Sequence, residues 1–151
     1  MISLQEGLTL LFGAAAVVED LRWRTISNWT TGGAMVAGIV YHAATGGWSG
    51  LGSSLLGLIV GFCGFLLFYL KGGMGGGDIK LMAGLGSLLG GAAASGMAVL
   101  FAAGVGGLLA CVVLAFRWLR TLLRRRKAVE SPFIPYAPAI AAGAWLTLLA
   151  G

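Results

Sequence analysis

Near the middle of the chain stands Gly72-Gly-Met-Gly-Gly-Gly-Asp-Ile-Lys80, in which five glycines lead directly into an aspartate. The sequence on both sides is apolar, so Asp78 stands at the mouth of a hydrophobic segment. A carboxylate is costly in such a place unless it has partners, and the glycines leave the backbone beside it bare. This combination predicts a place where another chain comes close to an acid.

The composition predicts a membrane protein that crosses the bilayer several times. The chain is 58% hydrophobic and 10% charged, whereas soluble domains carry about 25% charged residues. Its 27 glycines fit this class, because small residues let helices pack closely in lipid. The basic residues are clustered and cannot form a solvated basic face, so no nucleic-acid partner is expected. With one His and no CxxC pair, we expect no metal and no cofactor.

Six apolar segments approach the length of about 20 residues that a helix needs to cross the hydrocarbon core. They are Leu4–Val18, Asn28–Ala44, Leu51–Leu70, Ile79–Ala93, Gly96–Trp118 and Ile134–Ala150. The first has no basic residue before it, so we expect a retained span and not a signal peptide. The expected fold is therefore all-α, a polytopic membrane protein of six transmembrane helices that forms one domain over residues 1–151.

The distribution of charge gives these spans a direction. All ten Lys and Arg residues lie in or beside three of the five connections, and the connections around 45–50 and 90–95 have none. Cytoplasmic loops are enriched in Lys and Arg. The three basic connections are therefore expected in the cytoplasm, and both termini are expected outside it.

Two of the five acidic residues fall at the same predicted interface. Asp20 follows the first span and Asp78 precedes the fourth, and the topology places both on the cytoplasmic side. Two nearby carboxyl groups share a proton, because it is costly for both to be ionised at the same time. The ionised member can activate a water while the protonated member polarises a peptide carbonyl. Because the macrodipole favours negative charge at a helix N-terminus, we expect Asp78 to be the ionised member and Asp20 the protonated one.

Other interpretations of these residues stay open at this point. Each aspartate can instead be a solvated residue at a helix end, paired with Arg22 or Lys80. Glu19, directly beside Asp20, competes with it for the same role, and adjacent helical residues point about 100° apart. A small ion or proton transporter is a further alternative, although its spans would need polar residues at mid-depth. A non-catalytic assembly subunit is another.

Three motifs in this order resemble the bacterial type IV prepilin peptidases. Asp20-Leu-Arg-Trp-Arg-Thr-Ile-Ser-Asn28 is similar to D-x-R-x-x-x-I-P-N, and Gly75-Gly-Gly-Asp78-Ile-Lys80-Leu is similar to G-x-G-D-[VI]-K-[LM]. Ile134-Pro-Tyr-Ala-Pro-Ala-Ile140 is similar to the I-P-[FY]-[AG]-P segment that opens the last span. Ser27 replaces the usual proline, and a serine there can cap the next helix.

The resemblance implies a site and a reaction. Asp20 and Asp78 match the catalytic aspartates, which settles the competition with Glu19. The supporting positions implied by the motifs are Gly75, Gly77, Lys80, Asn28, Pro135 and Pro138. The implied reaction removes a short basic leader from a prepilin or pseudopilin after a glycine, at the cytoplasmic face of the bacterial inner membrane. The implied partners are the lipid bilayer and a substrate that is itself a membrane helix. The oligomeric state has no signal in the sequence.

The chain differs from full-length prepilin peptidases in one respect. Full-length members carry an insert after the first span, often with a CxxC pair, that is linked to methylation of the mature pilin. Here the first span runs directly to Asp20. The chain therefore resembles the short form that serves Flp (tight-adherence) pili, and methylation is not expected of it.

Overall fold

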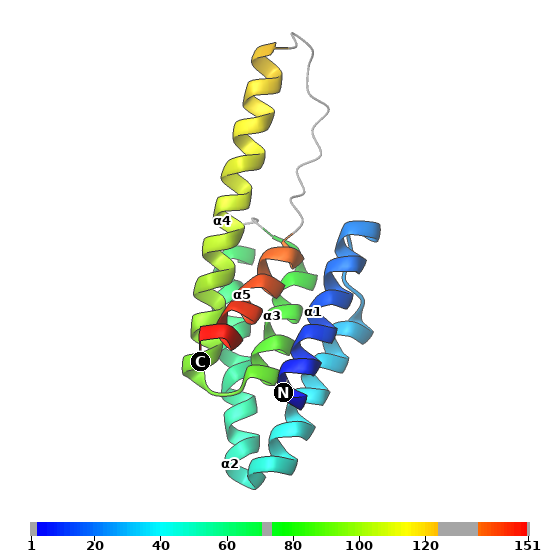
Figure 1. Ribbon diagram of the computed structural model, residues 1–151, viewed down its shortest axis with the longest axis vertical. Coiled ribbons are helices and arrows are strands. Elements are labelled where there is room, and N and C mark those ends of the chain that lie inside the picture. The colour runs from blue at the N-terminus through cyan, green and yellow to red at the C-terminus, as the bar shows by residue number, and fades with distance from the viewer. Residues whose placement is uncertain (1–2, 71–73, 124–135, 151) are drawn as a thin grey trace.

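The computed structural model describes residues 3–70, 74–123 and 136–150, with side chains in all of these except 109–123. Every regular element within these ranges is a helix (Figure 1), which confirms the predicted all-α class. The helices are α1 (Leu4–Trp23), α2 (Asn28–Leu70), α3 (Gly76–Leu89), α4 (Ala92–Leu123) and α5 (Ala137–Ala150). By length and hydropathy, α2 is the one helix of these described ranges that qualifies as a membrane span.

Short polar side chains and one left-handed residue set the limits of α1 and the start of α2. Ser3 caps α1, because its Oγ accepts from the N–H of Glu6 while the Glu6 carboxylate accepts from the N–H of Ser3. The helix ends where Arg24 adopts a φ of 55° and its N–H bonds to the carbonyl of Asp20. Ser27 Oγ then accepts from the N–H of Trp29 at 3.1 Å. The predicted capping role of Ser27 is thereby confirmed.

Helix α2 is a hairpin with two arms. Gly47 has a φ of 56° and a ψ of −136°, which is not helical, and the chain turns back at this residue (Figure 1). Glycine adopts a positive φ without steric cost. The first arm, residues 28–46, contains the predicted span 28–44, and the second arm, residues 48–70, contains the predicted span 51–70. The predicted turn over 45–50 is too wide, because both arms continue helically almost to Gly47.

Helix α3 lies at the centre of the bundle. Eleven of its fourteen residues are buried, and its Leu81, Met82, Leu85 and Leu88 are part of a core that also receives residues from every other helix. Both arms of α2 approach it closely through glycine. A Cβ placed on Gly38 of the first arm would collide with Ser87, and one on Gly61 of the second arm would lie 2.5 Å from the carbonyl oxygen of Met82.

The C-terminal end of α3 is held by side chains from its neighbours. A helix leaves its last four carbonyl groups without partners inside the helix. Here the carbonyls of residues 86 to 89 each accept a hydrogen bond from a different segment of the bundle. The donors are Ser95 Oγ to Gly86, Ser54 Oγ to Ser87, His42 Nε2 to Leu88 and Gln5 Nε2 to Leu89, at 2.9 to 3.1 Å. We call this set the α3 polar cap.

Several helix limits differ from the predicted spans, above all those of α3 and α4. The fourth span was expected over 79–93, but α3 runs from Gly76 to Leu89 and Gly90 ends it with a φ of 66°. Helix α4 begins at Ala92, whereas the fifth span was expected to begin at Gly96. The chain therefore needs only two residues, Gly90 and Gly91, to pass from α3 to α4. Asp78 consequently lies inside the first turn of α3 and not ahead of the helix.

Candidate active site

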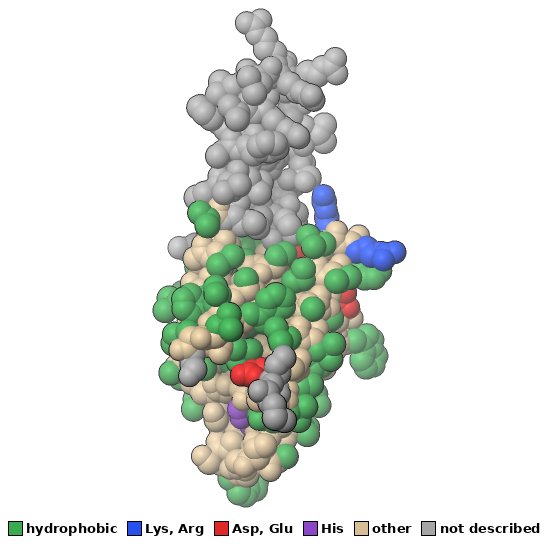
Figure 2. Space-filling view, viewed as in Figure 1, with side chains coloured by type: hydrophobic (Ala, Val, Ile, Leu, Met, Phe, Trp, Pro, Cys, Tyr) green, Lys and Arg blue, Asp and Glu red, His purple; other side chains and the backbone are tan. Residues whose placement is uncertain are grey.

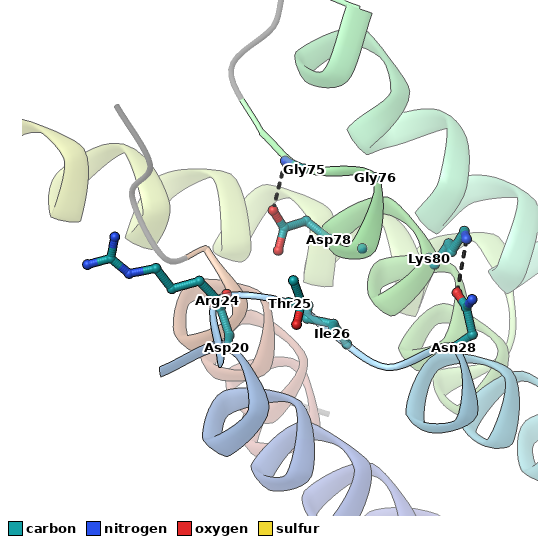
Figure 3. A pocket seen from close by; sticks show the side chains of 10 residues that line it. Asp20, Arg24, Thr25, Ile26, Asn28, Gly75, Gly76, Asp78 and Lys80 are labelled. Atoms are coloured by element: carbon teal, nitrogen blue, oxygen red, sulfur yellow. Dashed lines mark hydrogen bonds between the residues drawn. The ribbon is translucent and has the colours of Figure 1, made fainter. Parts of the chain in front are cut away.

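Asp20 and Asp78 lie at the same end of the bundle. Asp20 lies in the last turn of α1 and Asp78 in the first turn of α3, and both line one cavity of about 340 Å³ (Figure 3). Each side chain is only 5% exposed. The alternative of two solvated residues at helix ends does not fit this burial. Two helices that are distant in the sequence thus bring the two predicted carboxylates together.

Asp78 is held by the glycine segment that precedes it. Its Oδ2 accepts a hydrogen bond from the N–H of Gly75 at 3.1 Å, and Gly75 itself is extended, with a φ of −80° and a ψ of 155°. Asp78 is the third residue of α3, the position from which an acidic side chain bonds back to the N-cap. The glycine segment therefore contributes a backbone donor to the carboxylate as well as an open approach.

Asp20 is held by the start of the last helix. Its Oδ2 accepts from the N–H of Ala137 at 3.3 Å, and its main-chain carbonyl accepts from the N–H of Arg24. Ala137 is fully buried and is the first residue of α5. The N-terminus of α5 therefore points a donor at the carboxylate, and an orphan N–H of that helix gains its partner.

Both carboxyl groups are more basic than an ordinary aspartate, and both lie outside the predicted spans 4–18 and 79–93. Burial raises the pKa of Asp20, and the hydrogen bond from Ala137 opposes that rise. Burial raises the pKa of Asp78 to about 6, the hydrogen bond from Gly75 opposes it, and the charge of Asp20 raises it further. The raised pKa of Asp78 supports a proton on that carboxyl group. The helix-dipole argument, which does not include burial, gives the proton to Asp20 instead.

The cavity contains most of the predicted supporting residues. Besides the two aspartates, its lining comprises Arg24, Thr25, Ile26, Asn28, Gly75, Gly76, Gly77 and Lys80. Lys80 Nζ donates to Asn28 Oδ1 at 3.0 Å, which joins the start of α2 to the first turn of α3 (Figure 3). A Cβ on Gly77 would lie 3.3 Å from the Cβ of Ile26, so this glycine lets the α1–α2 connection pass close to α3.

Glu19 serves a different purpose from Asp20. Its Oε2 accepts from the N–H of Ser27 at 2.8 Å, and its Oε1 accepts from Thr30 Oγ1 at 2.7 Å. Both partners belong to the start of α2. Glu19 thus fastens the α1–α2 connection, while Asp20 lines the cavity on another side of α1.

The predicted site differs from the cavity lining in its two prolines and in several residues that the prediction did not include. Pro138 lies in the first turn of α5 and is not part of the cavity lining, and Pro135 lies outside the described residues. The prediction missed the lining residues Arg24, Thr25 and Ile26, although they stand between Asp20 and Asn28. It also missed the amide of Ala137, whose only signal was its place between the two prolines.

The arrangement provides two buried carboxyl groups beside an open cavity. Within the described ranges, no three His, Cys, Asp or Glu side chains lie close enough to share a metal ion. One ionised and one protonated carboxyl group can together activate water and polarise a carbonyl. Hydrolysis of a bond that enters this cavity is the chemistry that such a pair can perform.

The comparisons with known proteins agree with this chemistry. The family model of the type IV leader peptidases matches residues 7–112, a segment that includes both aspartates and the whole cavity lining. No curated protein and no solved structure is significantly similar to the chain.

Proposed function

The chain belongs to the type IV leader peptidase family, and from this premise we propose that it is an aspartic endopeptidase for Flp-type prepilins. It removes the short basic leader after a glycine, at the cytoplasmic face of the inner membrane. The observation that carries the proposal is the burial of Asp20 and Asp78 in one cavity between the end of α1 and the start of α3. Family membership supports a peptidase in general, and this pair supports the aspartic type.

The carboxyl groups take distinct roles in the proposed reaction. Asp20, ionised, takes a proton from water as the water oxygen attacks the peptide carbonyl carbon. Asp78, protonated, gives its proton to the carbonyl oxygen, and a gem-diol forms. The C–N bond then breaks, Asp20 returns its proton to the leaving nitrogen, and a gem-diol proton returns to Asp78. The products are a leader with a new carboxyl group and a mature chain with a new amino group.

The glycine segment suits a substrate that must be extended at the cleavage site. A helical peptide has its carbonyls in hydrogen bonds, so a membrane helix has to unwind locally before water can attack. Gly75, Gly76 and Gly77 form one side of the cavity, and residues without side chains let a second backbone approach. We propose that the unwound segment lies against these glycines.

The exposed surface of the protein supports a membrane location. Large apolar side chains are exposed on several helices, including Leu11, Trp29, Leu100 and Leu149 at 63% to 91%. On the face shown in Figure 2 hydrophobic side chains are spread over much of the described surface, and Lys and Arg lie at one end of it. Exposed apolar area of this extent marks a membrane or partner surface.

We further propose six spans, with residues 1–151 as one domain and both termini outside the cytoplasm. The two arms of α2 supply two of the spans, and the shared core joins all five helices. A topology reporter fused at Gly151 is expected to be active outside the cytoplasm. A cytoplasmic signal from that fusion would contradict the six-span arrangement.

Co-expression with an Flp-type prepilin tests the proposed reaction, with leader removal followed by mass spectrometry. Asp20→Asn and Asp78→Asn should each abolish processing while the protein still inserts in the membrane. Glu19→Gln is the matched control, because Glu19 is the neighbouring acid outside the cavity, and it should retain processing. Normal processing by both aspartate variants would refute the aspartic mechanism.

A further inference from the structure

A second, apolar cavity lies next to the one that holds the two aspartates. Its volume is about 100 Å³, and its walls include Phe65 and Phe68 of α2, Ala103 and Gly107 of α4, and Met74 and Tyr136. Phe68 is 46% exposed, so the cavity opens to the outer surface of the bundle. We call it the apolar cavity.

Two residues that line the apolar cavity directly precede the residues whose N–H groups bond to the two carboxyl groups. Met74 precedes Gly75, whose N–H bonds to Asp78, and Tyr136 precedes Ala137, whose N–H bonds to Asp20. Successive Cα atoms are about 3.8 Å apart. Two walls of the apolar cavity are therefore one residue away from the two amides that hold the aspartates. If a substrate peptide bond lies between the aspartates, the side chain of a residue next to that bond can reach the apolar cavity.

The size of the apolar cavity indicates a single side chain as its occupant. A dry protein cavity of roughly 150 Å³ holds one benzene molecule. A cavity of about 100 Å³ is therefore too small for a helix and suits one medium-sized apolar side chain, such as that of Val, Leu or Met.

The chemistry of the proposed substrate decides which side chain this is. The leader is basic, and an apolar cavity does not compensate the burial of a charged side chain. The residue before the cleaved bond is glycine and has no side chain to place. The residue after it begins a membrane helix and is apolar. We propose that the apolar cavity is the subsite for the side chain that directly follows the cleaved bond. This assignment rests on the proposed leader peptidase reaction.

Two glycines of α4 provide a matched pair of variants. A Cβ on Gly107 or on Gly104 would meet no atom within 4 Å, so both positions have room for a larger side chain. Only Gly107 is among the residues that line the apolar cavity. Gly107→Leu should therefore fill the cavity, while Gly104→Leu adds the same side chain to the same helix elsewhere.

The test measures kcat/KM for prepilins that carry Ala, Val, Leu or Lys directly after the cleaved glycine. Apolar pockets discriminate by about tenfold or more for each methylene that they bury. Wild type should prefer Leu to Ala by about tenfold or more and should reject Lys. Gly107→Leu should lose or reverse the preference for Leu, and Gly104→Leu should keep the wild-type order. The same order in Gly107→Leu as in wild type would overturn the subsite.

A crosslinking measurement keeps the subsite testable without cleavage. A leucine analogue with a photoreactive diazirine, which is close to leucine in size, replaces the residue after the glycine, and the Asp78→Asn enzyme holds the uncleaved prepilin in membranes. The crosslink is expected at Met74, Phe65 or Phe68, and Gly107→Leu should abolish it. Crosslinks only to residues outside the apolar cavity would refute the assignment. Failure of the wild type to process any prepilin would instead refute the proposed reaction, so the two failures are distinguishable.

Discussion

Asp20 Oδ2 accepts a hydrogen bond from the N–H of Ala137 at 3.3 Å, so the carboxylate at the end of the first helix is joined to the start of the last. Gly75 makes the equivalent bond to Asp78. Among the residues that the structure describes, each carboxyl group thus has one backbone donor on one of its oxygens. These donors favour the charged forms, whereas burial and mutual repulsion favour the neutral ones.

The first prediction concerns the electrostatic link between the two aspartates. Asp20→Asn removes a negative charge that raises the pKa of Asp78. The pKa of Asp78 should therefore fall below about 6 in this variant, yet stay above its ordinary value, because burial is the larger cause. Infrared difference spectra recorded against pH would follow the protonated carboxyl band, with Asp78→Asn to assign it. An unchanged or higher pKa would show that the two groups do not interact.

The second prediction concerns the pH dependence of cleavage. The reaction needs one proton on the pair, and Asp78, with a pKa of about 6, loses its proton as the pH rises. The profile of kcat/KM reports the free enzyme, so its fall on the alkaline side should have a midpoint near 6. A bound substrate excludes water and buries the pair further, so the corresponding fall in kcat should lie at higher pH. Glu19→Gln should leave both profiles unchanged.

The third prediction concerns the passage of the α1–α2 connection beside α3. A Cβ on Gly77 would lie 3.3 Å from that of Ile26, whereas one on Gly76 would meet Tyr69 at 3.9 Å. Gly77→Val should abolish prepilin cleavage while the protein still inserts, and Gly77→Ala should lower kcat/KM more than Gly76→Ala. Ile26→Ala should partly restore the activity of Gly77→Ala, because it removes the contact. No restoration by Ile26→Ala would assign the defect to another cause.

The fourth prediction concerns the α3 polar cap. Ser54→Ala leaves the buried carbonyl of Ser87 without this donor, and a buried unpaired carbonyl costs about 1–3 kcal/mol. Denaturant titration in detergent micelles should show a loss of this size in the free energy of unfolding. Ser53→Ala is the control, because Ser53 contributes a backbone carbonyl to Gly91 that the substitution retains. It should change the free energy of unfolding by less than about 0.5 kcal/mol.

The sequence predicted the helices and the position of both aspartates at one end of the bundle, because both depend on simple patterns. Runs of apolar residues predicted the arms of α2 and the turn between them. The positions of Lys and Arg predicted that Asp20 and Asp78 lie at the same end. These patterns are local or depend only on alternation along the chain, so a single sequence is enough to reveal them.

The contacts across the bundle could not be predicted in the same way. The bond from Ala137 to Asp20 joins residues 117 positions apart, and it depends on a backbone N–H that any residue except proline would provide. The four donors of the α3 polar cap appear in the sequence as ordinary polar residues on apolar helices. The raised pKa values of Asp20 and Asp78 depend on burial, which a helix-dipole argument does not contain.

The α3 polar cap also bears on how the protein fits its surroundings. A helix of 14 residues is about 21 Å long at 1.5 Å per residue, whereas the hydrocarbon core of a bilayer is about 30 Å thick. Because side chains satisfy the last carbonyls of α3, the helix can end at hydrocarbon depth without reaching water or headgroups. The outer helices alone then adjust to a thinner or thicker membrane by tilting. In a bilayer, the helix that carries Asp78 would therefore be shielded from hydrophobic mismatch, and its depth would not depend on lipid chain length.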